Sequence, residues 1–315
     1  GLAVVTGTTR LWSTGTVNLH GGRLTTGSFD NSQAGVFDFR DGTLTVNGEG
    51  GSFNPGTDDF TIDGLEATDL PELVIAGTAS GTLPGNLIIG ADQHGKLTVE
   101  AGSTVSNTTG TLGNATGATG TATVTGAGSV WNNSNDLLVG KEGTGTLYIT
   151  DSGTVEVTGT TSVATGSESV GTIHFENGML TTGSLFSSFE NLKGTGTINT
   201  RGLVSDVDLV FDTMHGLTQS LVLDASPEQN IALNLNVDGT GSLGAGYSGN
   251  GSLRVSDGMT ITSHDGYLAF KSGSTGTATV TGAGSRWTTE DDLIVGRYGD
   301  GTLNVEAGGV LVTDD

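Results

Sequence analysis

The stretch "GTATVTGAGSVW" at residues 120–131 returns as "GTATVTGAGSRW" at residues 276–287, with only Val130 exchanged for Arg286. Polar and apolar side chains alternate in "TATV", which is the period of a β-strand. The glycines that follow are typical of corners, because glycine adopts positive φ without steric cost. If Trp131 points inward, its neighbour at position 130 points outward, where valine and arginine are both tolerated.

The same motif, a glycine followed by an alternating run, recurs along the whole chain. Several successive copies are 25 residues apart, and the gaps from 42 to 95 and from 196 to 251 each fit two slightly longer turns. A fixed period of this length is the signature of a repeat architecture. The copies start at Gly15, Gly42, Gly95, Gly120, Gly145, Gly171, Gly196, Gly251, Gly276 and Gly301.

Each period holds three strand-like runs separated by glycine corners. This pattern predicts an all-β chain folded as a right-handed parallel β-helix, with about 25 residues per coil and roughly 12 coils. Each strand then pairs with its counterpart one coil above and below. The inward positions of the repeated stretch are Ala122, Val124 and Trp131, and we expect them to fill the interior.

A longer period of 156 residues lies above the short one. It relates "DLLVGKEGTGTL" (136–147) to "DLIVGRYGDGTL" (292–303) and "GTVNLHGGRLTTGS" (15–28) to "GTIHFENGMLTTGS" (171–184). It predicts one continuous rod made of a first module, a second module and the start of a third copy. Because no capping element is evident at either end, we expect the chain to be a slice of a longer array or a subunit that stacks end to end. The boundaries are 1–152, 153–308 and 309–315.

The charge balance excludes several classes of partner. The chain of 315 residues has 11 Lys and Arg against 34 Asp and Glu, a net charge of -23. Nucleic acids require clustered basic residues, and anionic membrane surfaces do as well, so we expect neither as a partner. There is no cysteine and no run of 18 apolar residues, which predicts neither a disulfide framework nor membrane insertion.

The candidate chemical groups favour a structural role over catalysis. The pair Asp291-Asp292 sits just before an expected strand, where Asp commonly satisfies turn backbone donors. The histidines are scattered without metal-ligand spacing, and the equivalent Lys141 and Arg297 are expected at solvated corners. We therefore predict no catalytic, cofactor-binding or metal residues and no cofactor, with weak cation binding at acidic corners left open. The groups considered are Asp58-Asp59, Asp291-Asp292, Asp314-Asp315, His20, His94, His174, His215 and His264.

Aromatic residues mark a second possibility, a glycan-binding outer face. Trp131, Trp287 and Trp12 are expected in the core, and the exposed candidates are Tyr148, Tyr247, Tyr267 and Tyr298. Two segments, 203–245 and 53–77, depart most from the regular pattern. Irregular coils of solenoids often form the binding face, so a partner is expected there.

The repeats "GTATVTGAGSxW" and "DLLVGxxGTGTL" resemble those of large bacterial surface proteins, including autotransporter-type passenger domains. The resemblance is strongest over 119–155 and 275–311. It implies a right-handed β-helix outside the cell, at the bacterial cell surface, that builds fibres or sheaths or mediates adhesion. We expect a non-enzymatic structural protein that self-associates end to end. The alternatives are an adhesin that binds surface or matrix glycans and, more distantly, a polysaccharide-degrading enzyme.

Overall fold

The computed structural model describes residues 1–226 and 229–314 as an all-β protein. The described part contains one short 3-10 helix, η1 (Phe189–Asn191). The strands form a parallel β-solenoid of about 12 coils with roughly 25 residues each, which confirms the predicted fold. Contacts divide the chain into a first unit, 1–180 with 193–196, and a second unit, 181–192 with 197–315. This division does not test the module boundaries at 152 and 308, which stay a prediction from the repeats.

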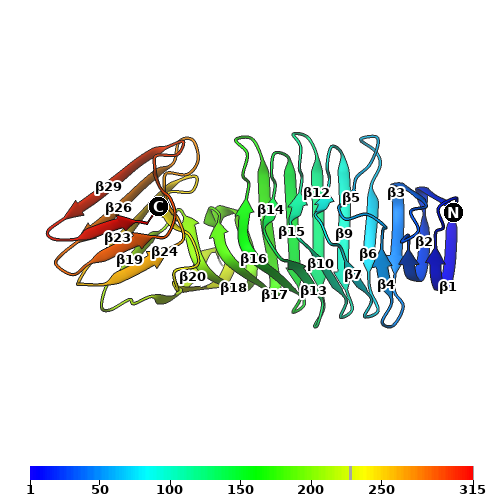
Figure 1. Ribbon diagram of the computed structural model, residues 1–315, viewed down its shortest axis with the longest axis horizontal. Helices are drawn as coiled ribbons and strands as arrows, with labels where there is room; N and C mark the ends of the chain where they lie inside the picture. Colours follow the sequence, from blue (N-terminus) through cyan, green and yellow to red (C-terminus); the bar gives the residue numbers. More distant parts are fainter. Residues whose placement is uncertain (227–228, 315) are drawn as a thin grey trace. The chain divides into compact units, whose positions relative to one another are not determined.

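Parallel strands of the first unit stack in three ladders, and successive coils lie side by side (Figure 1). The first ladder runs through β1 (Leu2–Arg10), β2 (Thr16–Asp30), β3 (Val36–Val46), β6 (Pro71–Ile75), β9 (His94–Glu100), β12 (Thr119–Thr125), β15 (Thr144–Thr150) and β17 (Val170–Phe186). The second includes β4 (Ser52–Asn54), β7 (Ser80–Thr82), β10 (Thr104–Asn107), β13 (Val130–Asn133) and the start of β16 (Thr154–Val163). The third includes β5 (Phe60–Ile62), β8 (Leu87–Ile89), β11 (Gly110–Leu112), β14 (Leu137–Val139) and the end of β16.

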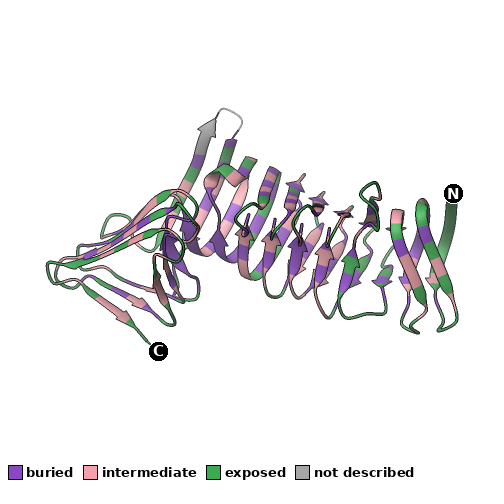
Figure 2. Ribbon diagram, turned by 90° about the horizontal axis from the view of Figure 1, so that it is seen from above, coloured by how far each residue is buried: buried purple, intermediate pink, exposed green. Residues whose placement is uncertain are grey.

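The repeated motif sets the register of these ladders. Gly120 in β12 pairs with Gly95 in β9 and with Gly145 in β15, so the sequence period is the coil period. Side chains alternate between buried and partly exposed along the strands (Figure 2). Ala122 and Val124 are fully buried, which confirms the predicted inward face.

The motif glycine is required for close backbone approach, a reason that sequence analysis did not identify. Gly120 does not have a positive φ. A Cβ atom at this position would instead collide with the carbonyl oxygen of Ile89 in the preceding coil. Positive φ applies instead at the next corner, where Gly126 and Gly128 have φ of 90° and 82°. The corner glycines therefore fit the expectation, and the strand glycine has a different cause.

Tryptophan fills the interior as predicted in both repeats. The Trp131 Nε1 donates to Asn107 Oδ1 at 2.7 Å, and both side chains are buried. Trp287 is equally buried and donates to Ser263 Oγ at 3.0 Å. The outward neighbour is half-buried at position 130 and exposed at position 286, so the tolerated exchange is confirmed.

The expectation of a core position for Trp12 is wrong. Its side chain is 61% exposed, whereas the preceding Leu11 is buried. Leu11 and Trp12 are adjacent in the chain, and the smaller aliphatic side chain takes the inward place at this turn.

The first coils are shorter than the rest, and the glycine motif at Gly15 lies on a different part of the coil from the motif at Gly42. Arg10 hydrogen-bonds to Asp30 across a coil of 20 residues. The run after Gly15 pairs with Val36–Phe39, not with the run after Gly42, which pairs with residues 23–26 and then with β6. The copies at Gly15 and Gly42 are therefore not structural equivalents. The matched stretches 15–28 and 171–184 are likewise not structural equivalents, because the run after Gly15 pairs with Val36–Phe39, ahead of the part of β3 that pairs with β6, whereas Gly171 pairs with Gly145 of β15.

The second unit contains the same three kinds of ladder. One runs through β19 (Asp208–Phe211), β23 (Asn250–Val255), β26 (Thr275–Thr281) and β29 (Asp300–Glu306). Another contains β24 (Thr260–Ser263), β27 (Arg286–Thr289) and β30 (Val310–Thr313). The third begins at the end of β18 (Leu192–Ser205) and continues through β22 (Leu243–Ala245), β25 (Gly266–Leu268) and β28 (Leu293–Val295).

An antiparallel hairpin interrupts the second unit, in the segment predicted to be irregular. Its strands are β20 (Thr218–Ser226) and β21 (Gln229–Asn236). Asp208 pairs directly with Ser252, 44 residues further along the chain. The expectation of two slightly longer turns between 196 and 251 is therefore wrong, because the hairpin enlarges a single coil. The gap from 42 to 95 does contain two turns, since Gly42 pairs with Pro71 and Glu72 pairs with Lys96.

Candidate functional site

An outer face of the second unit carries aromatic side chains that the equivalent face of the first unit lacks. Tyr267 lies on the outward side of β25, where Gly244 and Ile294 are its neighbours in the ladder. Gly244 leaves room for the tyrosine, because a Cβ atom there would contact the Tyr267 backbone. At the 156-residue offset, the corresponding outward positions of β8, β11 and β14 hold Ile88, Thr111 and Leu138.

Tyr267 belongs to a packed cluster of rings. Its ring meets Phe186 edge-on at 5.2 Å and Phe270 at 5.4 Å between centroids. Phe270 also stacks on the buried Tyr247 at 5.3 Å. Such contacts hold the rings in fixed positions. Burial, with a further contribution from the charge of Asp265, raises the pKa of Tyr267 to about 12, so its hydroxyl stays protonated and can donate at neutral pH.

A cation lies over the edge of this cluster. The Arg297 guanidinium carbon is 4.4 Å from the Phe270 ring centroid and 5.2 Å from that of Tyr298, both within cation–π range. Among the described residues, this guanidinium makes no hydrogen bond or ion pair. In the first unit the equivalent Lys141 Nζ bonds to Asn114 Oδ1 at 3.1 Å. The repeats thus keep the cation and exchange its polar partner for an aromatic one.

Carboxylates and an imidazole gather at the other end of β25. Asp265 accepts hydrogen bonds from Ser242 Oγ at 3.1 Å and from the Tyr267 hydroxyl at 3.4 Å. His264 and Asp291 complete a group whose ligand atoms lie within 4.8 Å of one another. These are donor types that divalent metals bind. Because His264 and Asp291 are exposed and the group consists of ordinary surface donors, it does not by itself define a metal site.

We call the surface formed by Asp265, Tyr267, Phe270, Arg297 and Tyr298 the aromatic face. It places a carboxylate at one end, phenyl and phenol rings in the middle, and a guanidinium with an exposed ring at the other end. Tyr298 is 67% exposed. Such a surface can pack against the apolar side of a ring-shaped ligand while its polar ends make hydrogen bonds.

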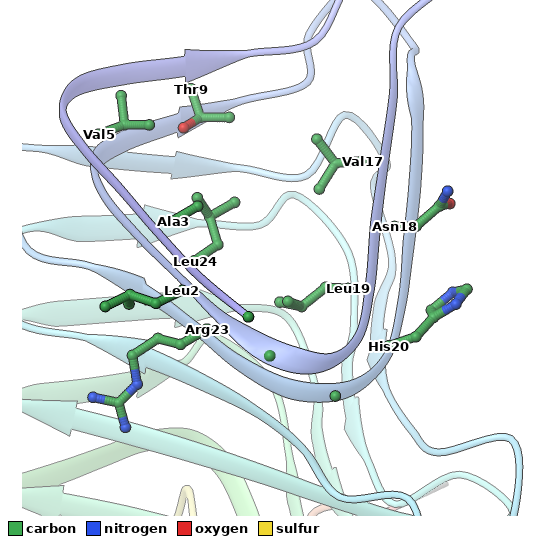
Figure 3. A pocket seen from close by; sticks show the side chains of 13 residues that line it. Leu2, Ala3, Val5, Thr9, Val17, Asn18, Leu19, His20, Arg23 and Leu24 are labelled. Atoms are coloured by element: carbon green, nitrogen blue, oxygen red, sulfur yellow. The ribbon is translucent and has the colours of Figure 1, made fainter.

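A second feature is the open interior at the first coil. Ala3, Val17, Leu19 and Leu24 point into a hollow there, whereas the side chain of Asn18 points away from it (Figure 3). β1 pairs with β2, and no strand among the described residues pairs with its other edge. This edge therefore presents unpaired backbone groups beside apolar side chains.

The last coil is open in the same manner. β28, β29 and β30 pair with β25, β26 and β27, and the described residues provide no strand beyond them. Val295 and Val305 are exposed on this coil, whereas their ladder partners Leu268 and Val280 are buried. Both terminal coils thus combine free strand edges with apolar side chains.

The described acidic pairs, Asp58-Asp59 and Asp291-Asp292, lie in the loops just before β5 and β28. Asp59 accepts a hydrogen bond from the Asn86 backbone N–H, 27 residues further along the chain, at 2.6 Å. Asp291 joins the corner beside His264, and Asp315 lies outside the described residues.

The histidines are dispersed over the two units, as expected. His20, His215 and His264 each lie beside an Asp carboxylate, at 2.9, 2.8 and 3.4 Å. His174 stacks on the Tyr148 ring at 4.9 Å between centroids. Burial, and secondarily the charge of Lys193, lowers the pKa of His174.

The four tyrosines predicted to be exposed behave differently from one another. Tyr148 and Tyr298 are exposed, Tyr267 is half-buried, and Tyr247 is 0% exposed, so the expectation is wrong for Tyr247. Phe270 covers its ring, which explains the burial. The phenylalanines of the cluster were missed because aromatic content alone does not show which rings meet. A position-by-position comparison of the two repeats does identify the site, because Tyr267 and Phe270 stand at the positions that Thr111 and Asn114 occupy in the first repeat.

No protein-family model, curated protein or solved structure matches this chain. Within the described residues, no helix is long and apolar enough to cross a membrane.

Proposed function

We propose that this protein is a non-enzymatic structural protein whose β-solenoid builds a bacterial surface fibre, sheath or appendage outside the cell. Coils stack end to end, and the first coil of one copy receives the last coil of another. The resemblance of its repeats to those of bacterial surface proteins supports this location and role. The hydrogen-bonded coils resist bending because each strand is tied to neighbours on both sides.

The observation that carries the proposal is the in-register pairing of successive coils, in which Gly120 pairs with both Gly95 and Gly145. At one end β1 offers a free edge with Val5 37% exposed beside the open interior. At the other end β28 and β29 carry the exposed Val295 and Val305, whose ladder partners Leu268 and Val280 are buried. Joining the two ends continues the parallel ladders and covers both sets of apolar side chains.

Sedimentation velocity over a range of protein concentrations tests this proposal. We expect the weight-average mass to rise with concentration, and Val5→Lys to reduce association by placing a charge at the end of the interior. Val36→Lys is the matched control, because Val36 is exposed on an inner coil. A mass that stays that of one chain at every concentration would contradict stacking, and so would equal effects of the two variants.

The aromatic face favours a second function, that of an adhesin that binds glycans. Exposed tyrosine and stacked arginine on one outer face are unusual in a chain with only 5% aromatic residues. A glycan array probed with the intact protein tests this function, and the absence of any bound glycan would remove it.

A further inference from the structure

We infer that the aromatic face binds an uncharged saccharide chain, with one sugar ring packed on Tyr298 or Tyr267. This inference rests on the glycan-binding alternative and is independent of end-to-end stacking. A pyranose ring offers C–H groups on one side and hydroxyls around its edge. Aromatic rings flanked by a few fixed polar groups suit such a ligand, because the rings cover the apolar side and the polar groups meet the hydroxyls.

The polar groups at both ends of the face are positioned before any ligand arrives. Asp265 is held by Ser242 and by the Tyr267 hydroxyl, so its carboxylate presents acceptors at a fixed place. Arg297 is held by ring contacts and not by an ion pair, so its N–H groups remain donors. A ligand with both hydroxyl donors and hydroxyl acceptors matches this combination.

The charge of the protein selects the class of saccharide. With 34 acidic against 11 basic residues, the chain repels a polyanionic polymer. Asp265 accepts a hydrogen bond from the Tyr267 hydroxyl and Asp291 lies beside Asp265, so both carboxylates add to this repulsion. An uncharged chain avoids it, and its hydroxyls can still donate to the carboxylates.

The exposure of Tyr298 follows from its place in the repeat. The equivalent residue of the first unit, Glu142, is exposed although another coil lies beyond it, where the Gly166 backbone donates to the Lys141 carbonyl at 2.7 Å. The position therefore faces outward in an inner coil as well. Tyr298 and Arg297 replace Glu142 and Lys141, which changes a charged corner into an aromatic one.

Isothermal titration calorimetry with cellohexaose, maltohexaose and mannohexaose tests the inference, with hexagalacturonic acid as the anionic comparison. We expect at least one neutral probe to bind and Tyr298→Ala to weaken that binding about tenfold, as the loss of a stacking contact predicts. Tyr267→Thr installs the residue of the other repeat and should weaken binding in the same direction. Tyr148→Ala is the control, because Tyr148 is an exposed tyrosine of the first unit that stacks on a histidine.

Each outcome has a separate meaning. Neutral binding that Tyr298→Ala and Tyr267→Thr leave unchanged overturns the site while glycan binding stands. Binding of hexagalacturonic acid alone overturns the uncharged class. If no probe binds and the glycan array also shows no bound glycan, the site and the adhesin alternative both fail. The end-to-end association of the coils is tested separately, by sedimentation velocity. Because Tyr298 is largely exposed, its variant should fold, and circular dichroism checks this.

Discussion

At the scale of the residue, the interior of the coils is apolar, and the buried Trp131 is held there by hydrogen bonds to other buried side chains. Trp131 donates to Asn107, whose amide donates onward to Asn133 Oδ1 at 2.9 Å. A buried polar atom without a partner is costly, so this chain of bonds fixes the tryptophan in one orientation. Ser263 takes the corresponding place beside Trp287.

Trp131→Phe should therefore destabilise the protein by about 1–3 kcal/mol, because it leaves the buried Asn107 oxygen without its donor. The midpoint of urea unfolding measures the effect. Trp12→Phe is the control, since Trp12 is exposed, and it should change stability by less than about 0.5 kcal/mol. Equal stability of the two variants would show that the Trp131 bond contributes nothing.

His174 gives a prediction for pH dependence. Burial lowers its pKa from the ordinary value of 6.5, and the charge of Lys193 lowers it further. The folded state therefore prefers neutral His174, so its contribution to stability is present above pH 6.5 and is lost as the pH falls toward the lower folded pKa. NMR titration of the imidazole should show this low pKa. Lys193→Gln should raise it but leave it below the ordinary value, because burial is the larger cause. A pKa at or above 6.5 in the wild-type protein contradicts this account.

At the scale of the element, the coil depends on glycines that allow two backbones to approach. Gly120→Ala should destabilise the protein by about 1–3 kcal/mol, because its Cβ atom meets the Ile89 carbonyl of the preceding coil. Gly7→Ala has open space around its Cβ atom and should stay within about 0.5 kcal/mol of wild type. Thermal unfolding compares the two, and a harmless Gly120→Ala would mean that the coils can move apart without cost.

Period and alternation predicted the strands, the three ladders and the inward face of the regular coils. They could do so because pairing joins identical motifs, as Gly95, Gly120 and Gly145 show. The prediction was wrong where the coil length changes. Around Gly15 the coil has 20 residues, and near Asp208 a hairpin enlarges it, so equal spacing in sequence no longer means the same ladder.

The aromatic face was harder to predict, for a physical reason. Its members come from different coils, and whether Tyr267 and Phe270 meet depends on the small Gly244 below them and on Phe186 beside them. Such contacts have no signature in the spacing of residues. In the sequence, the only sign of the site is that Tyr267 and Phe270 replace the Thr111 and Asn114 of the other repeat. This difference identifies the two positions but does not show that their rings touch.

At the scale of the whole molecule, we expect the coils to continue from one copy to the next. The most direct measurement is electron microscopy of the concentrated protein. We predict filaments of uniform width with a repeat of about 4.8 Å along their axis, the spacing of neighbouring strands in the ladders. Isolated particles of single chains at every concentration would contradict the account.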